Sequence, residues 1–542
     1  MWANLSARPK EETLELTMLG SPATLQPRAG QQPQSGELRS IPDVVCMIIP
    51  PSIFLLDERV FVSLGILRVA AVLEQRGVRV EMIDLSGIEN YLDVIEGHAK
   101  ATEATTFTLT TTTPQLPATR KIIERIRTSR PKAKVILGGP HVTLVNSARR
   151  LEALHKRKSR GHAAYEQLLS MVDVMVAGDG EAAVFEALKP DSPRLVDGDD
   201  PRGGFFMSNA SYESMPFPAR HLVDMDSYGY TVEGQRATSL IAQLGCPFGC
   251  GFCGGRSSKS LRMIRTRTTE SIVREVDVLH RTYGYTGFMF YDDELNVNKE
   301  MIGLMDALAD LQGRLGVEFR LRGFVKSELF NDDQAAAMYR AGFRWLLVGF
   351  ESGSPRILAN INKRATRDDN TRCVEIARRH NLKVKALMSL GHPGESPETA
   401  IDLHDWLIKV HPDDFDCTII TTYPGTPYYD EAVPHPALPD VYTYTMPKSG
   451  DRLHAYDLDY AEVADYYKGD PDGGYQAFVY TDFMTSEELV KTRDWVERDV
   501  RTKLDIPFNP SRAALRFEHS MGMSGSLPPY ILRASRHSAT AT

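Results

Sequence analysis

Apolar, β-prone runs alternate with amphipathic stretches along the first part of the chain. The short linkers between them favour a parallel, doubly wound α/β sheet of the Rossmann-like kind. Within residues 41–195 we expect strands at Val44–Ile49, Val78–Leu85, Thr106–Thr112, Val135–Leu137 and Val172–Val176, with helices near Ser63–Gln75 and Pro117–Ser129. Gly, Ser and Thr gather directly after these strands, where folds of this class bind ligands.

A second series, over residues 231–430, repeats the alternation in six units. Strands are expected at Thr238–Gln243, Gly287–Tyr291, near Val317–Arg322, and at Trp345–Phe350, Val384–Leu390 and Cys417–Thr422, with helices that include Gln334–Ala341 and Thr366–His380. Polar or glycine-rich residues follow most of these strands. The pattern therefore predicts a second α/β domain whose polar strand ends face one cavity.

The remaining segments lack this alternation. Residues 1–40 are rich in Pro, Gln, Ser and Gly, and residues 513–542 in Ser, Ala and Thr, so we expect disordered tails there. Residues 196–230 are expected to be a linker between the domains, and residues 431–512 a mostly helical capping segment. A capping box from Thr485 to Glu488 opens the amphipathic helix of that segment, which reaches about Lys503.

The composition excludes several classes of function. The 542 residues, 42% hydrophobic and 25% charged, are those of an ordinary soluble protein with more than one domain. The formal charge of -8 argues against nucleic acid as the main partner. No signal peptide or long apolar run is evident, so we expect no membrane insertion. Six cysteines, three of them clustered, indicate the reducing cytoplasm.

The clustered cysteines are Cys246, Cys250 and Cys253, in a glycine-rich loop that follows an expected strand. Thiolates suit iron–sulfur clusters or zinc. Structural zinc usually takes four ligands in two pairs, and no second CxxC or HxxxH pair lies near this loop. Three thiolates on a four-iron cluster would leave one iron open to a ligand. A zinc knuckle remains the alternative.

The CxxxCxxC spacing, with Phe252 before the last cysteine, resembles that of the radical S-adenosylmethionine (SAM) enzymes. The resemblance implies a [4Fe-4S] cluster whose open iron binds SAM and whose electron cleaves it to a 5′-deoxyadenosyl radical. The six β/α units would then form the partial (β/α)6 barrel of that family.

The same resemblance implies SAM contacts at the strand ends. Phe252 would lie against the adenine, Asp292 and Asp293 would meet the amino group, Arg322 the carboxylate, Glu351 and Ser352 the ribose, and Leu390, Gly391 and His392 the adenine. A helix N-cap is the alternative role for the two aspartates, and a structural salt bridge for Arg322. Cys373 and Cys417 are expected to be buried core residues.

The loops of the first domain resemble those of the cobalamin-binding domain in B12-dependent radical SAM enzymes. The resemblance rests on the Ser/Thr run, on Gly-Gly-Pro-His and on Gly-Asp-Gly-Glu, and it implies cobalamin contacts at Pro50, Ser52, Gly65, Thr110, Thr111, Thr112, Thr113, Gly138, Gly139, His141, Gly178, Gly180 and Glu181. A Rossmann-like domain for another nucleotide, or a structural one, is the alternative, although no GxGxxG motif follows the first strand. The chain has no DxHxxG motif, so we expect no axial histidine beneath the cobalt.

The combined resemblance is closest to the class B methyltransferases of the family. It implies a C-methyltransferase that moves a methyl group from SAM through methylcobalamin to a small-molecule, natural-product substrate, for which an aromatic or heteroaromatic part is one option. The alternatives are a ring-forming or ring-rearranging oxidoreductase, a non-radical methyltransferase and, in another class, a cobalamin or iron–sulfur sensor without catalysis.

The resemblance also implies an electron donor such as flavodoxin or ferredoxin, and we expect a monomer. A basic run after the cysteines is either a docking patch for such an acidic donor or a solvated face. The run consists of Arg256, Lys259, Arg262, Arg265 and Arg267.

Overall fold

The computed structural model describes residues 41–52, 58–156, 159–464 and 475–507. The two expected tails, residues 1–40 and 513–542, lie outside the described residues. Along the described part of the chain, no helix is both long and apolar enough to cross a membrane.

The first domain is a parallel six-stranded sheet in the order β2-β1-β3-β4-β5-β6, as the doubly wound prediction requires. The order reverses between β1 and β3, which makes the ends of these two strands a topological switch point. The strands are β1 Val44–Ile49, β2 Arg79–Asp84, β3 Thr106–Thr110, β4 Lys134–Gly138, β5 Val174–Gly178 and β6 Leu195–Gly198. β6 was not among the predicted strands, because at four residues it is too short to give a periodic signal.

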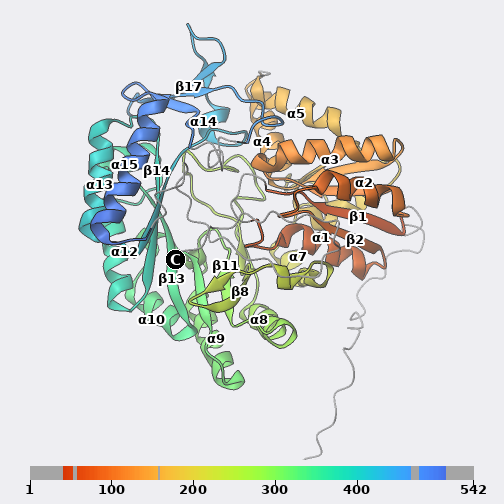
Figure 1. Ribbon diagram of the computed structural model, residues 1–542, viewed down its shortest axis with the longest axis horizontal. Helices are drawn as coiled ribbons and strands as arrows, with labels where there is room; N and C mark the ends of the chain where they lie inside the picture. Colours follow the sequence, from red (N-terminus) through yellow and green to blue (C-terminus); the bar gives the residue numbers. More distant parts are fainter. Residues whose placement is uncertain (1–40, 53–57, 157–158, 465–474, 508–542) are drawn as a thin grey trace, which may run out of the picture. The chain divides into compact units, whose positions relative to one another are not determined.

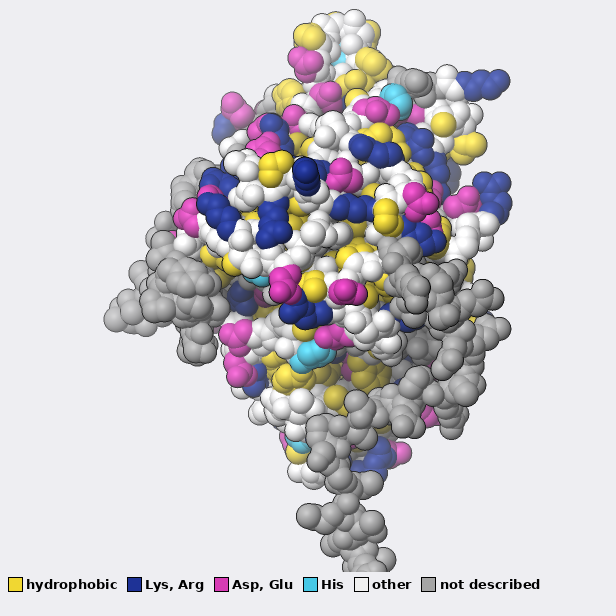
Figure 2. Space-filling view, turned by 90° about the vertical axis from the view of Figure 1, so that its right-hand side faces the viewer, with side chains coloured by type: hydrophobic (Ala, Val, Ile, Leu, Met, Phe, Trp, Pro, Cys, Tyr) yellow, Lys and Arg dark blue, Asp and Glu magenta, His cyan; other side chains and the backbone are white. Residues whose placement is uncertain are grey.

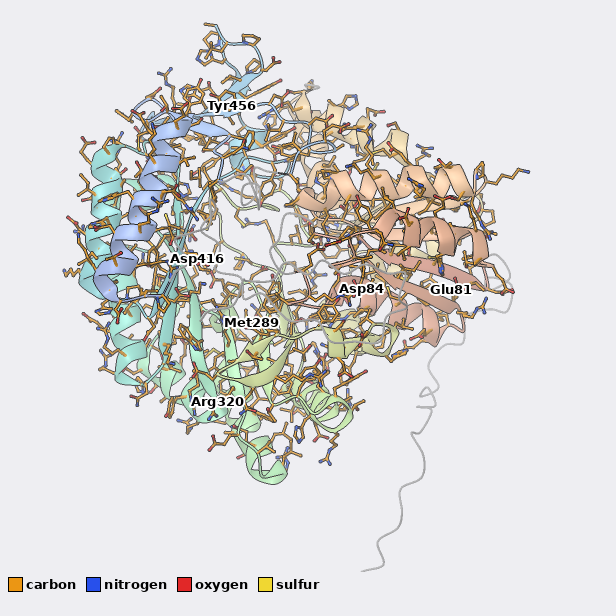
Figure 3. The ribbon with its side chains drawn as sticks, in the orientation of Figure 1. Glu81, Asp84, Met289, Arg320, Asp416 and Tyr456 are labelled. Atoms are coloured by element: carbon orange, nitrogen blue, oxygen red, sulfur yellow. The ribbon has the colours of Figure 1, made fainter. Side chains whose placement is uncertain are left out.

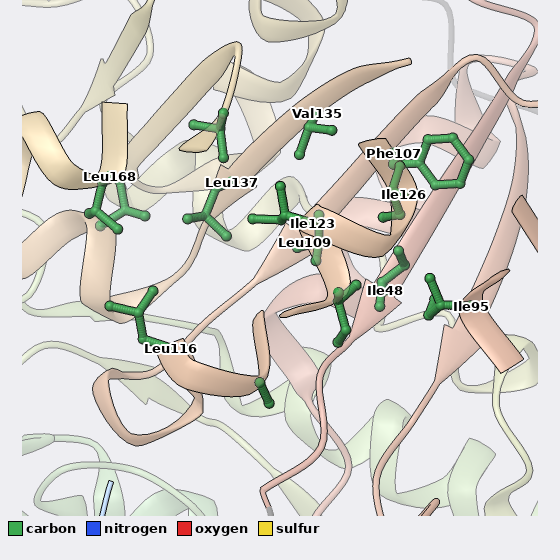
Figure 4. Packing of buried hydrophobic residues seen from close by; sticks show 14 of the residues in the cluster. Ile48, Ile95, Phe107, Leu109, Leu116, Ile123, Ile126, Val135, Leu137 and Leu168 are labelled. Atoms are coloured by element: carbon green, nitrogen blue, oxygen red, sulfur yellow. The ribbon is translucent and has the colours of Figure 1, made fainter. Parts of the chain in front are cut away.

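The central strands of this sheet are apolar on both sides because helices cover both faces of the sheet. Figure 4 shows Ile48, Phe107 and Leu137 from three strands packed against Ile95 and Ile123 from two helices. The helices are α1 Leu64–Gln75, α2 Tyr91–Ala101, α3 Leu116–Ser129, α4 Pro140–Leu154, α5 Arg160–Met171 and α6 Gly180–Leu188.

A linker that contains the short helix α7 Asn209–Ser214 leads to the second domain. Further along the chain, β9 Gln243–Leu244 pairs with β10 Arg265–Thr266, and the cysteine loop connects these two strands. The second domain is a curled sheet in the order β15-β14-β13-β12-β11-β8-β7, and all six expected strands are present. All pairs are parallel except β7–β8. The strands are β7 Thr231–Val232, β8 Gln235–Leu240, β11 Gly287–Phe290, β12 Arg320–Phe324, β13 Phe343–Glu351, β14 Lys383–Leu390 and β15 Asp414–Ile419.

Helices follow the outer side of the curled sheet (Figure 1). Along β12, Leu321 and Gly323 are buried on the side of the helices, whereas Arg320, Arg322 and Phe324 on the inner face keep accessible surface. The inner face is therefore open to a ligand. The helices are α8 Thr269–Tyr283, α9 Met301–Leu315, α10 Asp332–Ala341, α11 Pro355–Asn360, α12 Arg367–Arg379 and α13 Pro397–Val410.

The capping segment differs in part from the expectation. Its helix is present as α15 Ser486–Leu504, with the predicted capping box between Thr485 and Glu488. The residues before it form an antiparallel sheet instead of helices, because their alternating Val, Tyr and Thr side chains favour strands. The elements are α14 Pro427–Asp430, β16 Val433–Pro434, β17 Val441–Thr445, β18 Arg452–Tyr456 and β19 Val479–Thr481.

Candidate functional site

The three clustered cysteines lie in a loop between β9 and β10, and backbone hydrogen bonds from distant segments fix its course. The amide of Gly251 donates to the carbonyl of Ile361 over 2.8 Å, and the amide of Gly255 donates to that of Gly425 over 3.1 Å. The side chain of Asn362 donates to the carbonyl of Gly249 over 3.0 Å. The loop is thus held by the segments that follow α11 and β15.

The three thiols are free and lie close enough to influence one another. Burial raises the pKa of Cys253, and the charges of Cys250 and Cys246 raise it further. Burial likewise raises the pKa of Cys250, but there Lys363 and Lys326 act in the opposite direction. Three free thiols on one loop, with positive charge beside them, fit an iron–sulfur cluster. In the described ranges, no three His, Cys, Asp or Glu side chains are grouped to suit a single metal ion.

Asp292 supports the start of the cysteine loop. Its buried carboxylate accepts hydrogen bonds from the amides of Ala242 and Gln243 at 3.2 and 2.6 Å. Burial raises its pKa to about 7. The N-cap alternative for Asp292 is wrong, since the next helical turn, the 3-10 helix Leu295–Val297, has Glu294 as its N-cap, and α9 has Glu300. Asp293 stays exposed and makes none of these contacts.

Glu351 lies at the centre of a buried network beside the cysteine loop. Its carboxylate pairs with Lys363 over 2.9 Å and accepts a hydrogen bond from Ser389 over 2.9 Å. The Ser389 hydroxyl also contacts His392 Nε2 at 2.8 Å. Burial by itself would raise the pKa of Glu351, but Lys363 holds it below its usual value. Burial lowers the pKa of His392 to about 4, so its imidazole is neutral at physiological pH.

Three rings lie in contact next to the loop. Phe252 is 5.4 Å from His392 between centroids, and His392 is 6.2 Å from Tyr428. His392 Nδ1 and the Tyr428 hydroxyl are buried without a hydrogen-bond partner among the described residues, so a bound ligand could supply one. A Cβ on Gly251 would lie 2.8 Å from Tyr428, so only glycine fits there without a shift.

The other expected SAM contacts are placed as follows. Ser352 is buried and its hydroxyl accepts from the amide of Ser354 over 3.1 Å. Leu390 is fully buried at the end of β14, and the Gly391 amide donates to Glu395 over 3.2 Å. Gly391 has φ 87°, which favours glycine.

Arg322 lies on the inner face of the sheet rather than at the cysteine loop. Its Nη1 donates to the Tyr230 hydroxyl over 3.4 Å, and its guanidinium lies 6.0 Å from the Trp345 ring. Among the described residues, no acidic side chain pairs with Arg322, so the structural salt bridge is not observed. The cations that act on Cys250 are instead Lys363 and Lys326.

The docking-patch reading of the basic run fails for most of its members. Arg265 is buried and pairs with Asp179 of the first domain, and Arg267 is buried and pairs with Glu275. Arg262 donates to two carbonyls of the cysteine loop. Arg265 and Arg267 are therefore engaged in ion pairs inside the fold, and Arg262 in hydrogen bonds to the backbone. On the face shown in Figure 2, basic and acidic side chains are interspersed.

The switch point of the first sheet is held together by Gln115. Its amide donates to the carbonyl of Pro50 and to the hydroxyl of Ser52, both at 3.0 Å. Its carbonyl oxygen accepts from Thr112 in a capping box. Thr112 remains exposed beside it. The loop after β1 and the loop after β3 thus form one surface at the place where such sheets bind ligands.

Other residues of the Thr run are used inside the domain. The Thr119 hydroxyl donates to Thr111 over 3.0 Å, and Thr113 contacts His141 Nδ1 at 3.0 Å. His141 is buried, which lowers its pKa to about 3. His141 lies in the first turn of α4, whose N-cap is Gly139 without a side-chain cap hydrogen bond, so its side chain does not cap the helix and its role toward cobalamin stays a prediction.

Two of the expected cobalamin glycines are required by close backbone packing. A Cβ on Gly139 would lie 2.6 Å from the Thr110 hydroxyl, and one on Gly178 would lie 2.4 Å from the Asp199 amide. A Cβ on Gly138 would make ordinary van der Waals contact, 3.6 Å from the carbonyl oxygen of Val176. Gly65 is exposed with nothing within 4 Å of such a Cβ, so a large ligand has room to approach it. Gly180 and Glu181 begin α6, where burial raises the pKa of Glu181.

The cysteine loop contacts the first domain directly. A Cβ on Gly254 would lie 3.4 Å from Leu144 of α4, and one on Gly425 would lie 2.8 Å from the same side chain. The approach of Leu144 therefore needs glycine at Gly425, whereas at Gly254 the distance is that of a tight van der Waals contact.

Sequence reasoning missed Lys363, Tyr428 and Gln115. The Thr-x-x-Gln spacing from Thr112 to Gln115 is a capping-box signal that could have found the last of these. Lys363 reaches the site from the loop after α11 and Tyr428 from the short helix α14, and the sequence carries no local signal for either.

Two families match parts of this chain. Residues 240–407 match the radical SAM superfamily, and residues 58–155 match the B12 binding domain. An uncharacterized methyltransferase of Pyrococcus horikoshii is 26% identical over 317 residues, which is 55% of this chain and 63% of that protein. Bacteriochlorophyllide d C-12(1)-methyltransferase of Chlorobaculum tepidum is 25% identical over 35% of this chain and 42% of that protein. The anaerobic magnesium-protoporphyrin IX monomethyl ester cyclase of Rubrivivax gelatinosus is 21% identical over 59% of this chain and 57% of that protein.

The chain thus matches less than two thirds of the length of these relatives. Among solved structures, the radical SAM methyltransferase TsrM of Kitasatospora setae, with tryptophan substrate and a SAM analog bound, has a TM-score of 0.58 at 17% identity over 85% of this chain and 89% of TsrM. OxsB with aqua-cobalamin bound has a TM-score of 0.53 at 15% identity, over 73% of this chain and 55% of OxsB. These likenesses establish a common fold.

Proposed function

Because this chain joins a B12-binding domain to a radical SAM domain, as cobalamin-dependent radical SAM enzymes do, we propose that it is a C-methyltransferase for a small molecule with an aromatic or heteroaromatic part. Relatives named as methyltransferases support the reaction, and the tryptophan bound to TsrM supports the substrate class. When bound, the cluster would supply the electron that cleaves SAM, and cobalamin would supply the methyl carrier.

One observation carries the proposal. Leu144, five residues after Gly139 in the loop that follows β4, lies against both the cysteine loop at Gly254 and the β15 loop at Gly425. The ligand-binding edge of the first sheet and the ligand-binding edge of the second therefore meet at the cysteines. A methyl carrier and a radical source held at these two edges would face the same substrate.

The residues divide by cofactor as follows. Cys246, Cys250 and Cys253 would hold the cluster, and Asp292 would position their loop through the amides of Ala242 and Gln243. Phe252, Asp293, Glu351, Ser352, Leu390, Gly391 and His392 would surround SAM, with Lys363 beside it. Pro50, Ser52, Gly65, Thr112, Gly178 and Gly180 would border cobalamin, while Thr111, Thr113 and His141 support these loops from inside.

Three finer expectations belong to the same proposal. The electron donor would be a flavodoxin or ferredoxin, the chain would be a monomer, and its cluster would require the reducing cytoplasm. The capping segment would exclude water, which protects a radical from quenching.

A second function has support from the relatives that are named as cyclases. A cyclase would cleave SAM without moving its methyl group. The test uses full-length protein reconstituted with iron, sulfide and cobalamin, then given SAM and a reductant. The proposal predicts both S-adenosylhomocysteine and 5′-deoxyadenosine, and a triple Cys→Ala variant should lose the deoxyadenosine. Deoxyadenosine alone would favour the cyclase.

A further inference from the structure

Arg322 differs from the other cations on the inner face of the curled sheet. Lys383 pairs with Glu233 over 3.0 Å, Lys385 pairs with Asp416 over 2.9 Å, and the neighbouring Arg320 pairs with Glu318 over 2.8 Å. Arg322 has no acidic partner among the residues that the structure describes, and its Nε is buried without a hydrogen-bond acceptor. Figure 3 shows Met289 and Asp416, which belong to this inner face on β11 and β15.

A buried cationic atom without a partner is costly, and an anionic ligand would offset that cost. The planar guanidinium of arginine matches a carboxylate through two parallel hydrogen bonds. Among the described residues, the side-chain hydrogen bond of Arg322 is the 3.4 Å contact with the Tyr230 hydroxyl, which is long for a hydrogen bond. The guanidinium of Arg322 can therefore donate hydrogen bonds to the carboxylate of a ligand.

Aromatic side chains surround the approach to Arg322. We define the aromatic cluster as Phe61, Tyr230, Tyr291 and Phe324. Phe61 lies 4.7 Å from Tyr230 and 5.1 Å from Tyr291 between ring centroids, and Tyr291 lies 6.2 Å from Phe324. Phe61 comes from the loop after β1 of the first domain, Tyr230 ends the linker directly before β7, and Tyr291 and Phe324 come from the second domain. The cluster therefore stands between the two ligand-binding edges.

This cluster is not a closed core. Tyr291 is 48% exposed, and Phe61 and Phe324 keep part of their surface accessible. Accessible aromatic faces next to one another suit a flat ring, which can stack on or meet the edges of such side chains. The ring site and the carboxylate site are adjacent because Phe324 and Arg322 point to the same face of β12.

We infer that the substrate is a planar aromatic acid whose ring lies in the aromatic cluster and whose carboxylate binds Arg322, an inference that rests on the proposed function. In this inference Arg322 binds the carboxylate of the substrate, whereas the resemblance implied that it binds the carboxylate of SAM. Positive charge near the cysteines comes instead from Lys363 and Lys326.

Titration calorimetry on the reconstituted full-length protein tests the inference with indole-3-acetate and its uncharged match, indole-3-acetamide. Wild type should bind the acid about tenfold more tightly than the amide, because a hydrogen bond to a charged group is worth that much. Arg322→Gln should remove the preference, and Arg322→Lys should restore part of it. Arg320→Gln, on the same strand and face, should keep it.

Equal binding of the two probes by wild type, no binding of indole-3-acetate, or a preference that survives Arg322→Gln would overturn the inference. Cleavage of SAM by reduced Arg322→Gln protein is the second readout. It should persist, whereas a SAM-binding role predicts its loss. A methyl-transfer failure in wild type would defeat the proposed function and leave the binding preference standing, so the two failures are distinguishable.

Discussion

The carboxylate of Asp292 accepts a hydrogen bond from the amide of Gln243 over 2.6 Å, and this contact joins the end of β11 to the start of the cysteine loop. Asp292 therefore positions the loop, whereas its exposed neighbour Asp293 is free to meet a ligand.

Substitutions of Asp292 and Asp293 should have different effects on the cluster and on SAM binding. Asp292→Ala leaves two amides unpaired and should lower the iron and sulfide recovered after anaerobic reconstitution to less than half of wild type. Asp293→Ala should keep the cluster and raise KM for SAM about tenfold, the effect of one hydrogen bond to a charged group. Equal iron content in both variants, measured by colorimetric iron and sulfide assays, would refute this division of roles.

Glu275 should control the stability of the second domain. It is buried between Arg220, at 2.6 Å, and Arg267, and Glu275→Gln should cost about 3–5 kcal/mol because it leaves buried cations unpaired. Burial opposes its ionisation, but the two arginines lower its pKa to about 2 from an ordinary 4.5. A lowered carboxyl pKa stabilises the fold above the unfolded pKa, so this contribution is complete above pH 4.5 and fades as the pH falls toward 2.

Urea unfolding between pH 3 and 8 measures the difference between wild type and Glu275→Gln. That difference should be constant in the upper range and shrink below about pH 4.5. Asp277→Asn, which removes an exposed pair with Arg281 on the same helix, is the matched control and should change stability by about 0.5 kcal/mol or less. A Glu275→Gln effect no larger than the control would mean that the basic run does not brace the fold.

Gly251 should tolerate no side chain while Tyr428 is present. Gly251→Ala places a methyl 2.8 Å from the Tyr428 ring, and such overpacking costs about 1–3 kcal/mol. Cluster content and SAM cleavage should fall together. The double variant Gly251→Ala/Tyr428→Leu should regain cluster content, because it removes the clash. If it recovers nothing, the contact with Tyr428 is not the reason for glycine.

The cobalt should have no protein nitrogen beneath it. His141, the histidine nearest in sequence to the cobalamin loops, is buried and bonded to Thr113, and the chain has no DxHxxG motif. Electron paramagnetic resonance of the cobalt(II) form should therefore lack nitrogen superhyperfine splitting from an axial ligand. Splitting that disappears in His141→Gln would identify the histidine as a ligand after all.

The sequence predicted the elements better than the contacts between them. Alternating apolar runs located all six expected strands of the second domain, because each strand is long enough to carry a pattern. The spacing of Cys246, Cys250 and Cys253 indicated the site for the same local reason. Short β6 and the β17–β19 sheet were missed, since brief strands with many tyrosines resemble interfacial loops.

Roles that depend on distant partners could not be predicted. Arg265 and Arg267 look like a surface patch in the sequence, yet both are buried, Arg265 paired with the distant Asp179 and Arg267 paired with Glu275 on α8. Arg322 differs from its neighbours because no acidic side chain of the described residues pairs with it, and a local sequence pattern cannot show this. Lys363 enters the site through a loop after α11 that carries no motif.

The most direct test of the account follows the methyl group. Holoenzyme with reductant and a small-molecule extract of its source is given equal parts of SAM and methyl-trideuterated SAM. The account predicts a new product that appears as a pair of masses differing by three deuterium atoms, together with equal amounts of S-adenosylhomocysteine and 5′-deoxyadenosine. A product without the mass pair, formed with 5′-deoxyadenosine but no S-adenosylhomocysteine, would contradict it.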